Sequence, residues 1–349
     1  MQEFQISANE AGQRLDKFLH KYLKEASTSF LYKMLRKKNI TLNKKKAEGK
    51  EMLELNDKIQ FFFSDETFYK FRGVDNTNVA KGKENSQKDN VLKNNPATKD
   101  YKQAYAKFKN IQVIFENEHI ALLNKPAGIL SQKSTPSDLS LNEWFIGYLL
   151  ENGQITEKQL ETYKPSICNR LDRNTSGLVV CGKSLLGSQT MNRLIKERQL
   201  KKFYRTFVKG QIKEGQYLKG FLKKNEETNK VIFKDKITDK QTEEFVPIET
   251  AYEPVSYQKG YTYLEVELIT GKTHQIRAHL AGMGHPLLGD KKYGDRKWNQ
   301  SMKSLKISDW QLLHSYRVEF PKMEGVFGEL SEKVFVATEP EIYHTLKEN

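Results

Sequence analysis

A long polar stretch at residues 73–110 constrains the fold of this 349-residue chain more than any other feature. Lys, Asn, Asp, Gln and Ser dominate the stretch, and large aliphatic residues are few in it. A segment this polar cannot bury enough apolar surface to compensate for the conformational entropy lost on ordering. We therefore expect a flexible linker over 73–110, with some helix at 101–108, between two folded units at 1–72 and 111–349.

The positive charge of the chain is concentrated in its first third. Lys and Arg number 58 against 44 Asp and Glu, a formal net charge of +14, and residues 1–110 carry 23 basic and 14 acidic residues. Such an excess is typical of a module that binds a polyanion, because each neutralised phosphate releases counterions. A general preference for lysine in the proteome is the alternative, and composition does not separate the two.

Composition excludes several classes of protein. With 37% hydrophobic residues the chain has enough apolar material for a packed core, so wholesale disorder is excluded. No window approaches 18 consecutive apolar residues, and the N-terminus MQEFQISANE lacks a signal-peptide pattern, so we expect neither a membrane span nor secretion. Cys168 and Cys181 alone provide no disulfide framework, which indicates a cytoplasmic location.

The first unit shows two short helices followed by strands. Apolar residues recur at helical spacing in 15–22 and again in 30–35, with Ser27 and Thr28 as caps of the second helix. A turn is expected at residues 56–57. The residues that predict short strands are Ile40, Leu42, Leu53, Leu55, Ile59, Phe61 and Phe63.

Basic residues lie between these helices and strands, where they can ring one edge of the unit: Arg36, Lys37, Lys38, Lys44, Lys45 and Lys46. The segment RLDKFLHKYLKEASTSFLYKMLRKKNITLNKKK resembles the small RNA-binding domain of the S-four type, which is shared with a small-subunit ribosomal protein. The resemblance implies a basic helix face, with Arg36, Lys37 and Lys38, that follows an RNA backbone. A surface whose lysines only improve solvation is the plain alternative.

The second unit mixes strands and helices without a regular alternation. The run VIFENEHIALLNKPAGI, residues 113–129, predicts two strands around a turn at 116–118, and residues 261–270 alternate as a half-buried strand does. Helical periodicity occupies 187–198 and 274–283. The pattern favours a mixed α+β domain.

Three segments carry polar residues where apolar strands end. In NRLDRNTSGLVVCGKS (169–184), Asp172 lies between Arg170 and Arg173, and nearby guanidinium groups keep a carboxylate ionised. The second segment is KKFYRTFVKG (201–210), with Tyr204 in a strand-like run, and the third is LITGKTHQIRAHLAGMGHPLLGDKKYG (268–294). From spacing alone, a structural ion pair in a loop remains an equally good interpretation of the first segment.

Together these segments resemble the RluA-type pseudouridine synthases, which isomerise uridine in ribosomal and transfer RNA. The similarity runs in a fixed order through nearly the whole second unit, including residues 113–129 and the late LLHSYRVEF. It implies an α+β catalytic domain with a mixed, mostly antiparallel central sheet, the pseudouridine synthase fold, behind a small α/β RNA-binding domain. It also implies an isomerase that converts specific uridines of structured RNA to pseudouridine.

The resemblance implies a role for each residue that matches a motif. Asp172 is the essential carboxylate, which attacks the ribose C1′ or acts as the base in an elimination route. Tyr204 lies against the uracil ring and assists removal of the proton from C5. Arg277 pairs with Asp172 and keeps it charged. Contacts to the substrate are assigned to Arg170, Lys272 and His274.

The chemistry of the reaction agrees with this assignment. Cleavage of a glycosidic C–N bond, rotation of the base and formation of a C–C bond require one nucleophile or base, an aromatic surface and a water-poor pocket. No redox step and no group donor take part, so no cofactor is expected. No metal is expected either, because His274, His279 and His285 do not follow a pattern such as H-E-x-x-H.

Two residues depart from the family pattern. Asn169 stands where many members have histidine, and it bears on how the Asp172 loop is braced. Lys272 stands where arginine is frequent, and it keeps the charge but loses the fork-shaped donor. We expect both departures to affect the choice of substrate more than the activity.

Large-subunit ribosomal RNA is the expected substrate, and transfer RNA is an alternative. A noncatalytic RNA-binding factor in ribosome assembly is a second alternative, against which the joint presence of Asp172, Tyr204 and Arg277 argues. A glycosidase would need two separated carboxylates, and the loop offers one. Neither a membrane nor an obligate protein partner is expected, and the sequence does not predict the oligomeric state.

Overall fold

The computed structural model describes residues 1–7, 9–73, 98–225, 227–228, 230–242, 244–258, 260–302 and 310–348. Most of the predicted linker, residues 74–97, lies outside these described residues. One hydrophobic core is built from buried residues between Ile6 and Phe68, and the other clusters begin at Ala104. The described chain therefore packs as two units, each around its own core.

The first unit combines a four-stranded antiparallel sheet, in the order β1-β4-β2-β3, with three helices. The Ser27 hydroxyl accepts a hydrogen bond from the Phe30 amide and so caps the second helix. The elements are β1 (Gln2–Gln5), α1 (Leu15–Tyr22), α2 (Thr28–Arg36), β2 (Ile40–Leu42), β3 (Lys45–Lys46), β4 (Lys58–Phe61) and α3 (Asp65–Arg72).

The strands of the first unit differ in part from the sequence-based expectation. Leu53, Leu55 and Phe63 lie outside the strands, so the prediction was wrong for these three residues. The backbone of Leu53 instead exchanges hydrogen bonds with the loop at residues 12–13, and its side chain is buried, whereas Leu55 is exposed. The Leu53 side chain is thus in the core although its backbone is not part of a strand. Apolar periodicity alone cannot distinguish such a buried loop residue from a strand residue.

The second unit is built on an 11-stranded sheet in the order β11-β10-β12-β13-β9-β14-β8-β6-β5, with β15 beside β14 and β7 beside β8. Its pairs are antiparallel except for β14 with β8, so the predicted mixed and mostly antiparallel α+β fold is confirmed. The strands are β5 (Gln112–Glu116), β6 (Ile120–Lys125), β7 (Ser166–Ile167), β8 (Ser176–Gly182), β9 (Lys201–Lys209), β10 (Gln216–Asn225), β11 (Lys230–Lys234), β12 (Val246–Gln258), β13 (Tyr261–Leu268), β14 (Leu313–Glu319) and β15 (Val334–Val336).

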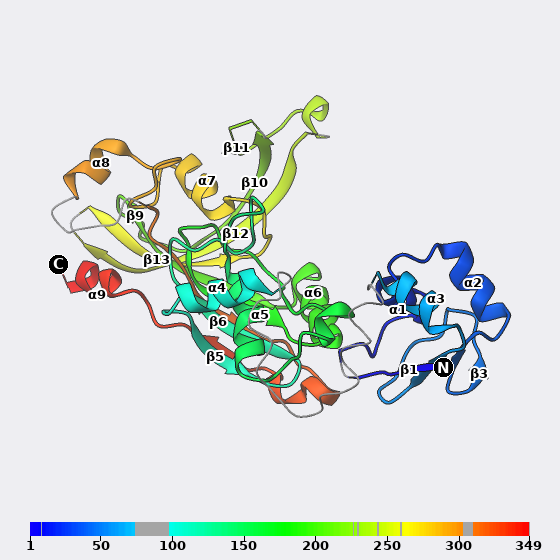
Figure 1. The fold of residues 1–349 in the computed structure, drawn as a ribbon. Coiled ribbons are helices and arrows are strands. Elements are labelled where there is room, and N and C mark those ends of the chain that lie inside the picture. The colour runs from blue at the N-terminus through cyan, green and yellow to red at the C-terminus, as the bar shows by residue number, and fades with distance from the viewer. Residues whose placement is uncertain are drawn as a thin grey trace.

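Helices pack around this sheet (Figure 1). They are α4 (Lys99–Lys107), α5 (Leu141–Glu151), α6 (Leu185–Lys196), α7 (Gln275–Gly282), α8 (Arg296–Ser301) and α9 (Glu341–Glu348), with 3-10 turns at Gln159–Glu161, Asp239–Gln241 and Gly325–Leu330. Within the part of the chain that the structure describes, no helix combines the length and the apolar character needed to cross a bilayer.

Helix α4 occupies the end of the range 73–110 that the sequence assigned to the linker. It packs on α5 so closely that a Cβ atom added to Gly147 would lie 2.3 Å from the Tyr101 carbonyl oxygen. Ala104 of α4 is fully buried in the main core of the second unit. Residues 99–107 therefore pack with the second unit, because Tyr101 and Tyr105 lie against the same core as Ala104 and Gly147 leaves room for the close approach of α4.

The first unit, blue in Figure 1, lies beside the larger unit at the side where α6 is found. The Gln189 amide of α6 donates to the Gly12 carbonyl at 3.5 Å, and the Thr162 hydroxyl donates to the Glu10 carboxylate at 2.5 Å. Both contacts are made by polar groups. The apolar cores of the two units thus stay separate, and the site described below is formed by the second unit alone.

Candidate active site

Asp172 lies in the loop between β7 and β8, and side chains from elsewhere in the chain hold this loop in place. Asn169, one of the two departures from the pattern of the resembled family, accepts a hydrogen bond from the Val180 amide at 2.7 Å. The Ser131 hydroxyl accepts from the Leu171 amide at 3.0 Å and donates to the Leu171 carbonyl at 2.7 Å. These bonds fix the backbone that precedes Asp172.

Lys125, the last residue of β6, holds the other side of the loop. Its buried ammonium group donates to the carbonyl groups of Pro126, Ile129 and Arg173 at 3.0, 2.9 and 3.0 Å. Burial lowers the pKa of Lys125 to about 7, and the nearby charge of Asp172 opposes this shift. The loop that carries Asp172 is therefore tied to the loop that follows β6.

Arg277, in α7, joins two carboxylates. Its Nη1 lies 2.7 Å from Oδ2 of Asp172, and its Nε and Nη2 lie 2.7 and 2.9 Å from the two oxygens of Asp290. The side chains of Arg277 and Asp290 are 6% and 0% exposed, so this is a buried ion pair. Burial raises the pKa of Asp290, but the hydrogen bonds and the charge of Arg277 outweigh it and lower that pKa below its usual range.

The arrangement leaves one oxygen of the Asp172 carboxylate available for chemistry. Among the described residues, Arg277 holds the Oδ2 atom of Asp172, and Oδ1 makes no hydrogen bond. The side chain of Asp172 is 26% exposed, whereas that of Arg277 is 6% exposed. A carboxylate anchored through one oxygen presents the other in a fixed direction, as a nucleophile or base requires.

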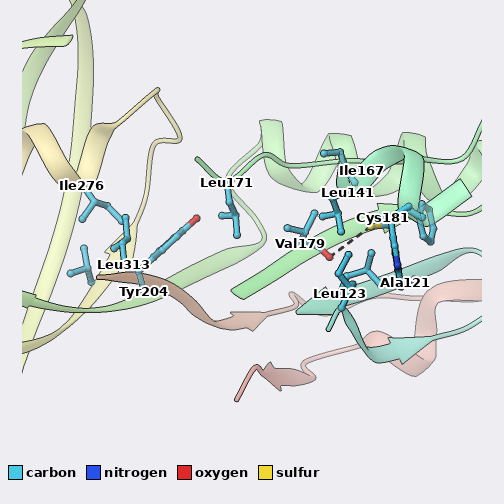
Figure 2. Packing of buried hydrophobic residues seen from close by; sticks show 14 of the residues in the cluster. Ala121, Leu123, Leu141, Ile167, Leu171, Val179, Cys181, Tyr204, Ile276 and Leu313 are labelled. Carbon is cyan, nitrogen blue, oxygen red and sulfur yellow. Dashed lines mark hydrogen bonds between the residues drawn. The ribbon is translucent and has the colours of Figure 1, made fainter. Parts of the chain in front are cut away.

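Tyr204, in β9, supplies an aromatic wall. It pairs with Ser315 of β14 and is 4% exposed. In Figure 2 its ring lies between Leu171 and the pair Ile276 and Leu313, with the phenol oxygen toward Leu171. Burial raises the pKa of Tyr204 to about 12, so the phenol keeps its proton at neutral pH.

One pocket brings together six of the residues that the sequence predicted for the site. Exposed basic side chains stand at its rim, and apolar side chains line its walls. The six predicted residues are Asp172, Tyr204, Arg277, Arg170, Lys272 and His274, and the apolar wall consists of Leu171, Leu268, Ile276 and Leu313. The pocket thus combines a carboxylate, an aromatic ring, a positively charged rim and an apolar wall.

Other predicted residues lie elsewhere. Arg36, Lys37 and Lys38 are exposed at the end of α2 in the first unit and do not line this pocket. His279, in α7, is buried, and its Nδ1 atom lies 3.0 Å from the hydroxyl of Thr250 in β12. His285 makes a hydrogen bond to the carbonyl of another residue, Lys209. These two histidines therefore do not converge with His274.

Sequence reasoning missed three residues that organise the site. They are Lys125, Asp290 and Tyr293, whose hydroxyl lies 3.0 Å from Nδ1 of His274. For Lys125 the available signal was a charged residue at the end of the apolar run IALLNK. For Asp290 and Tyr293 it was the run GDKKYG between two glycines, a short polar loop that follows apolar residues.

Comparison with known proteins supports the family resemblance that the sequence motifs showed. Residues 119–282 match the family model described as RNA pseudouridylate synthase. An uncharacterized RNA pseudouridine synthase of Mycoplasma genitalium is 30% identical over 328 residues, which is 92% of this chain and 90% of that protein. The ribosomal large subunit pseudouridine synthase C of Escherichia coli K12 is 27% identical over 303 residues, 85% of this chain and 81% of that protein.

A solved structure agrees at the level of the fold. The human RNA pseudouridylate synthase domain containing 4 covers 72% of this chain with 97% of its own length, at a TM-score of 0.54 and 19% identity. The matched family model includes the Asp172 loop, Tyr204 and the Arg277 helix. The similarity over nearly the whole chain to an RNA pseudouridine synthase, together with the family model matched over residues 119–282, shows that the chain belongs to the RNA pseudouridylate synthase family.

Proposed function

We propose that this RNA pseudouridine synthase acts on large-subunit ribosomal RNA, with Asp172 as the nucleophile or base. The role of Asp172 is supported by its ion pair with Arg277 in a pocket that Tyr204 closes on one side. Support for the substrate comes from relatives named ribosomal large subunit pseudouridine synthase C, such as those of Escherichia coli and Vibrio parahaemolyticus.

Each residue of the pocket contributes one part of the isomerisation. In one route Oδ1 of Asp172 attacks C1′ of the ribose and displaces N1 of uracil, and the Oδ1–C1′ bond breaks again when C5 bonds to C1′. In the other route Oδ1 removes a proton from the sugar as the C1′–N1 bond breaks, and it returns that proton after C5 has bonded to C1′. The apolar wall at Leu171 and Leu313 keeps water away while the base turns and C5 approaches C1′. Once the C–C bond has formed, C5 loses its proton to solvent and N1 takes one up from solvent, and the Tyr204 phenol, which we place against the base, assists the loss from C5.

Binding energy from the RNA backbone supports this chemistry. The target nucleotide must leave its stack to enter the pocket, which costs a few kcal/mol. Arg170 and Lys272 at the pocket rim, and the exposed Arg36, Lys37 and Lys38 in the first unit, provide cations for phosphate contacts. We therefore assign the first unit to RNA binding and the second to catalysis.

The substrate assignment is tested by mapping pseudouridines in ribosomal RNA from cells with and without the gene. Carbodiimide modification followed by primer extension stops at each pseudouridine. We expect one or a few stops in large-subunit RNA to disappear without the gene and to return with the wild-type chain but not with Asp172→Ala. Loss of stops in transfer RNA alone would reject the ribosomal substrate, and no loss in either RNA would reject both.

Neutralising the basic end of α2 should weaken RNA binding in a salt-dependent manner. The triple variant Arg36→Gln, Lys37→Gln and Lys38→Asn removes three exposed charges, with asparagine at position 38 because Lys38 has a φ of 59°. The slope of log affinity against log salt is negative, and each lost phosphate contact makes its magnitude smaller by about 0.7–0.9. The magnitude of the slope measured by filter binding should therefore fall by up to about 2–3.

A charge-matched control separates this surface from general electrostatics. Lys196, Lys322 and Lys333 are exposed residues of the second unit, and their replacement by glutamine removes the same total charge. We expect this control to change the salt slope by less than half of the effect of the α2 variant. Equal slopes for the two variants would contradict a specific role of the α2 surface.

A further inference from the structure

His274 lines the active-site pocket next to Asp172. It precedes α7 with a φ of 53°, a left-handed conformation that residues other than glycine seldom adopt. Its side chain is 8% exposed and lines the pocket, with Nε2 3.8 Å from Oδ2 of Asp172. A strained backbone that turns a buried ring toward the reacting carboxylate indicates a function for that ring.

Hydrogen bonds on the far side of the ring determine which nitrogen carries the proton. The Val231 amide of β11 donates to the Tyr293 hydroxyl oxygen at 2.8 Å, and this hydroxyl lies 3.0 Å from Nδ1 of His274. The phenol oxygen already accepts from the backbone amide, so donation of the phenol proton to Nδ1 completes the hydrogen bonds of this hydroxyl. In a neutral ring Nδ1 is then the acceptor, and the single ring proton resides on Nε2.

The electrostatics on the pocket side favour the same tautomer. A lone pair on Nε2 would face the negative charge of Asp172, whereas an N–H group there is attracted to it. Burial lowers the pKa of His274, the charges of Arg277 and Lys292 act in the same direction, and Asp172 and Asp290 oppose them. The net direction keeps the ring neutral, so the pocket side of His274 is a single N–H donor.

This donor does not form a hydrogen bond with Asp172, because 3.8 Å exceeds hydrogen-bonding distance. It points into the pocket beside the carboxylate that reacts at the ribose C1′. We propose that Nε2–H of His274 binds an oxygen of the target nucleotide next to C1′, and that Tyr293 and the Val231 amide fix the tautomer needed for it. Of the oxygens near C1′, the ribose 2′-hydroxyl and the uracil O2 are the good hydrogen-bond acceptors, since the ring oxygen O4′ is a weak one. This assignment rests on the proposed function, which supplies the nucleotide.

The tautomer is tested without any turnover. In protein labelled with 15N-histidine, long-range nitrogen–proton spectra distinguish a protonated Nε2 from a protonated Nδ1, and His274→Asn identifies the signals. We expect Nε2 protonated and Nδ1 unprotonated at neutral pH, and loss of this preference in Tyr293→Phe. A protonated Nδ1, or a fully protonated ring, in the wild type would overturn the inference even if the enzyme is active.

The donor itself is tested with two matched variants. An asparagine side chain tolerates the left-handed backbone and can retain a contact to Tyr293, but it lacks a group at the Nε2 position. A glutamine amide can place an N–H group near that position. We expect His274→Asn to lower the single-turnover rate on bound RNA by about 100-fold with little change in RNA affinity, and His274→Gln to recover most of the rate.

Modified substrates identify the oxygen and distinguish this inference from the proposed function. RNA with 2′-deoxyuridine or 2-thiouridine at the target removes one candidate acceptor each. The modification that removes the partner of His274 should slow the wild type but should not slow His274→Asn any further. Equal rates of wild type and His274→Asn on unmodified RNA would reject the donor role of His274 and leave the proposed function standing. A wild type that is inactive on every RNA would reject the proposed function, and the tautomer measurement would then decide the inference about His274.

Discussion

Replacing Asp172 with asparagine is expected to lower the rate of pseudouridine formation by about 10⁴-fold or more, as removal of a nucleophile does in other enzymes. The amide has the shape of the carboxylate, and its oxygen can still accept the hydrogen bond from Nη1 of Arg277. It cannot attack carbon or accept a proton at neutral pH. The loss should therefore appear in the single-turnover rate and not in the affinity for RNA.

The measurement is release of tritium from RNA labelled at C5 of uridine, with circular dichroism and RNA binding recorded on the same samples. Asp239→Asn is the matched control, because Asp239 is an exposed aspartate in a 3-10 turn. It should keep the wild-type rate. A rate for Asp172→Asn within tenfold of the wild type would contradict the assignment of Asp172 as nucleophile or base.

Replacing Arg277 with methionine is expected to cause both a large loss of stability and a large loss of activity. The Asp290 side chain is completely buried, and among the described residues Arg277 is the cation that pairs with it, so the substitution removes that ion pair. Breaking a buried ion pair in this way costs about 3–5 kcal/mol. Activity should fall as well, since Asp172 loses the group that anchors its Oδ2 atom.

A second substitution separates the two effects. In the double variant Arg277→Met and Asp290→Asn the buried carboxylate is gone, so most of the lost stability should return in urea unfolding. Turnover should remain low, because Asp172 is still unanchored. Full recovery of activity in the double variant would contradict the anchoring role, and a single variant as stable as the wild type would contradict the buried pair.

The stability deficit of Arg277→Met should also depend on pH. Arg277 lowers the pKa of Asp290 in the folded wild type below its unfolded value near 4. The pair therefore stabilises the wild type fully above about pH 4, and this contribution is lost as the pH falls through the folded pKa. The variant lacks the contribution, so the difference between the two proteins should be largest near neutral pH and should shrink in acid.

The local elements of this protein followed closely from its sequence. The helices α1 and α2 were predicted from the 3.6-residue spacing of their buried side chains, and alternation over residues 261–270 predicted β13, which spans Tyr261–Leu268. The order of motifs also predicted the family and the mostly antiparallel sheet. Periodicity failed at Leu53, whose burial does not come with strand pairing, and α4 begins two residues before the helix predicted at 101–108 and ends one residue before its end.

By itself, the sequence determined the family, and it predicted the division into two units and the residues that we propose for the reaction, because spacing and side-chain type are properties of the chain. The tertiary structure alone decided which groups control them. Asp172 and Arg277 are 105 residues apart and meet only through the packing of α7 on the sheet. The buried carboxylate of Asp290, the three carbonyl acceptors of Lys125 and the phenol beside His274 are likewise pairings between distant segments. Such pairings depend on distances and burial, which no local pattern encodes.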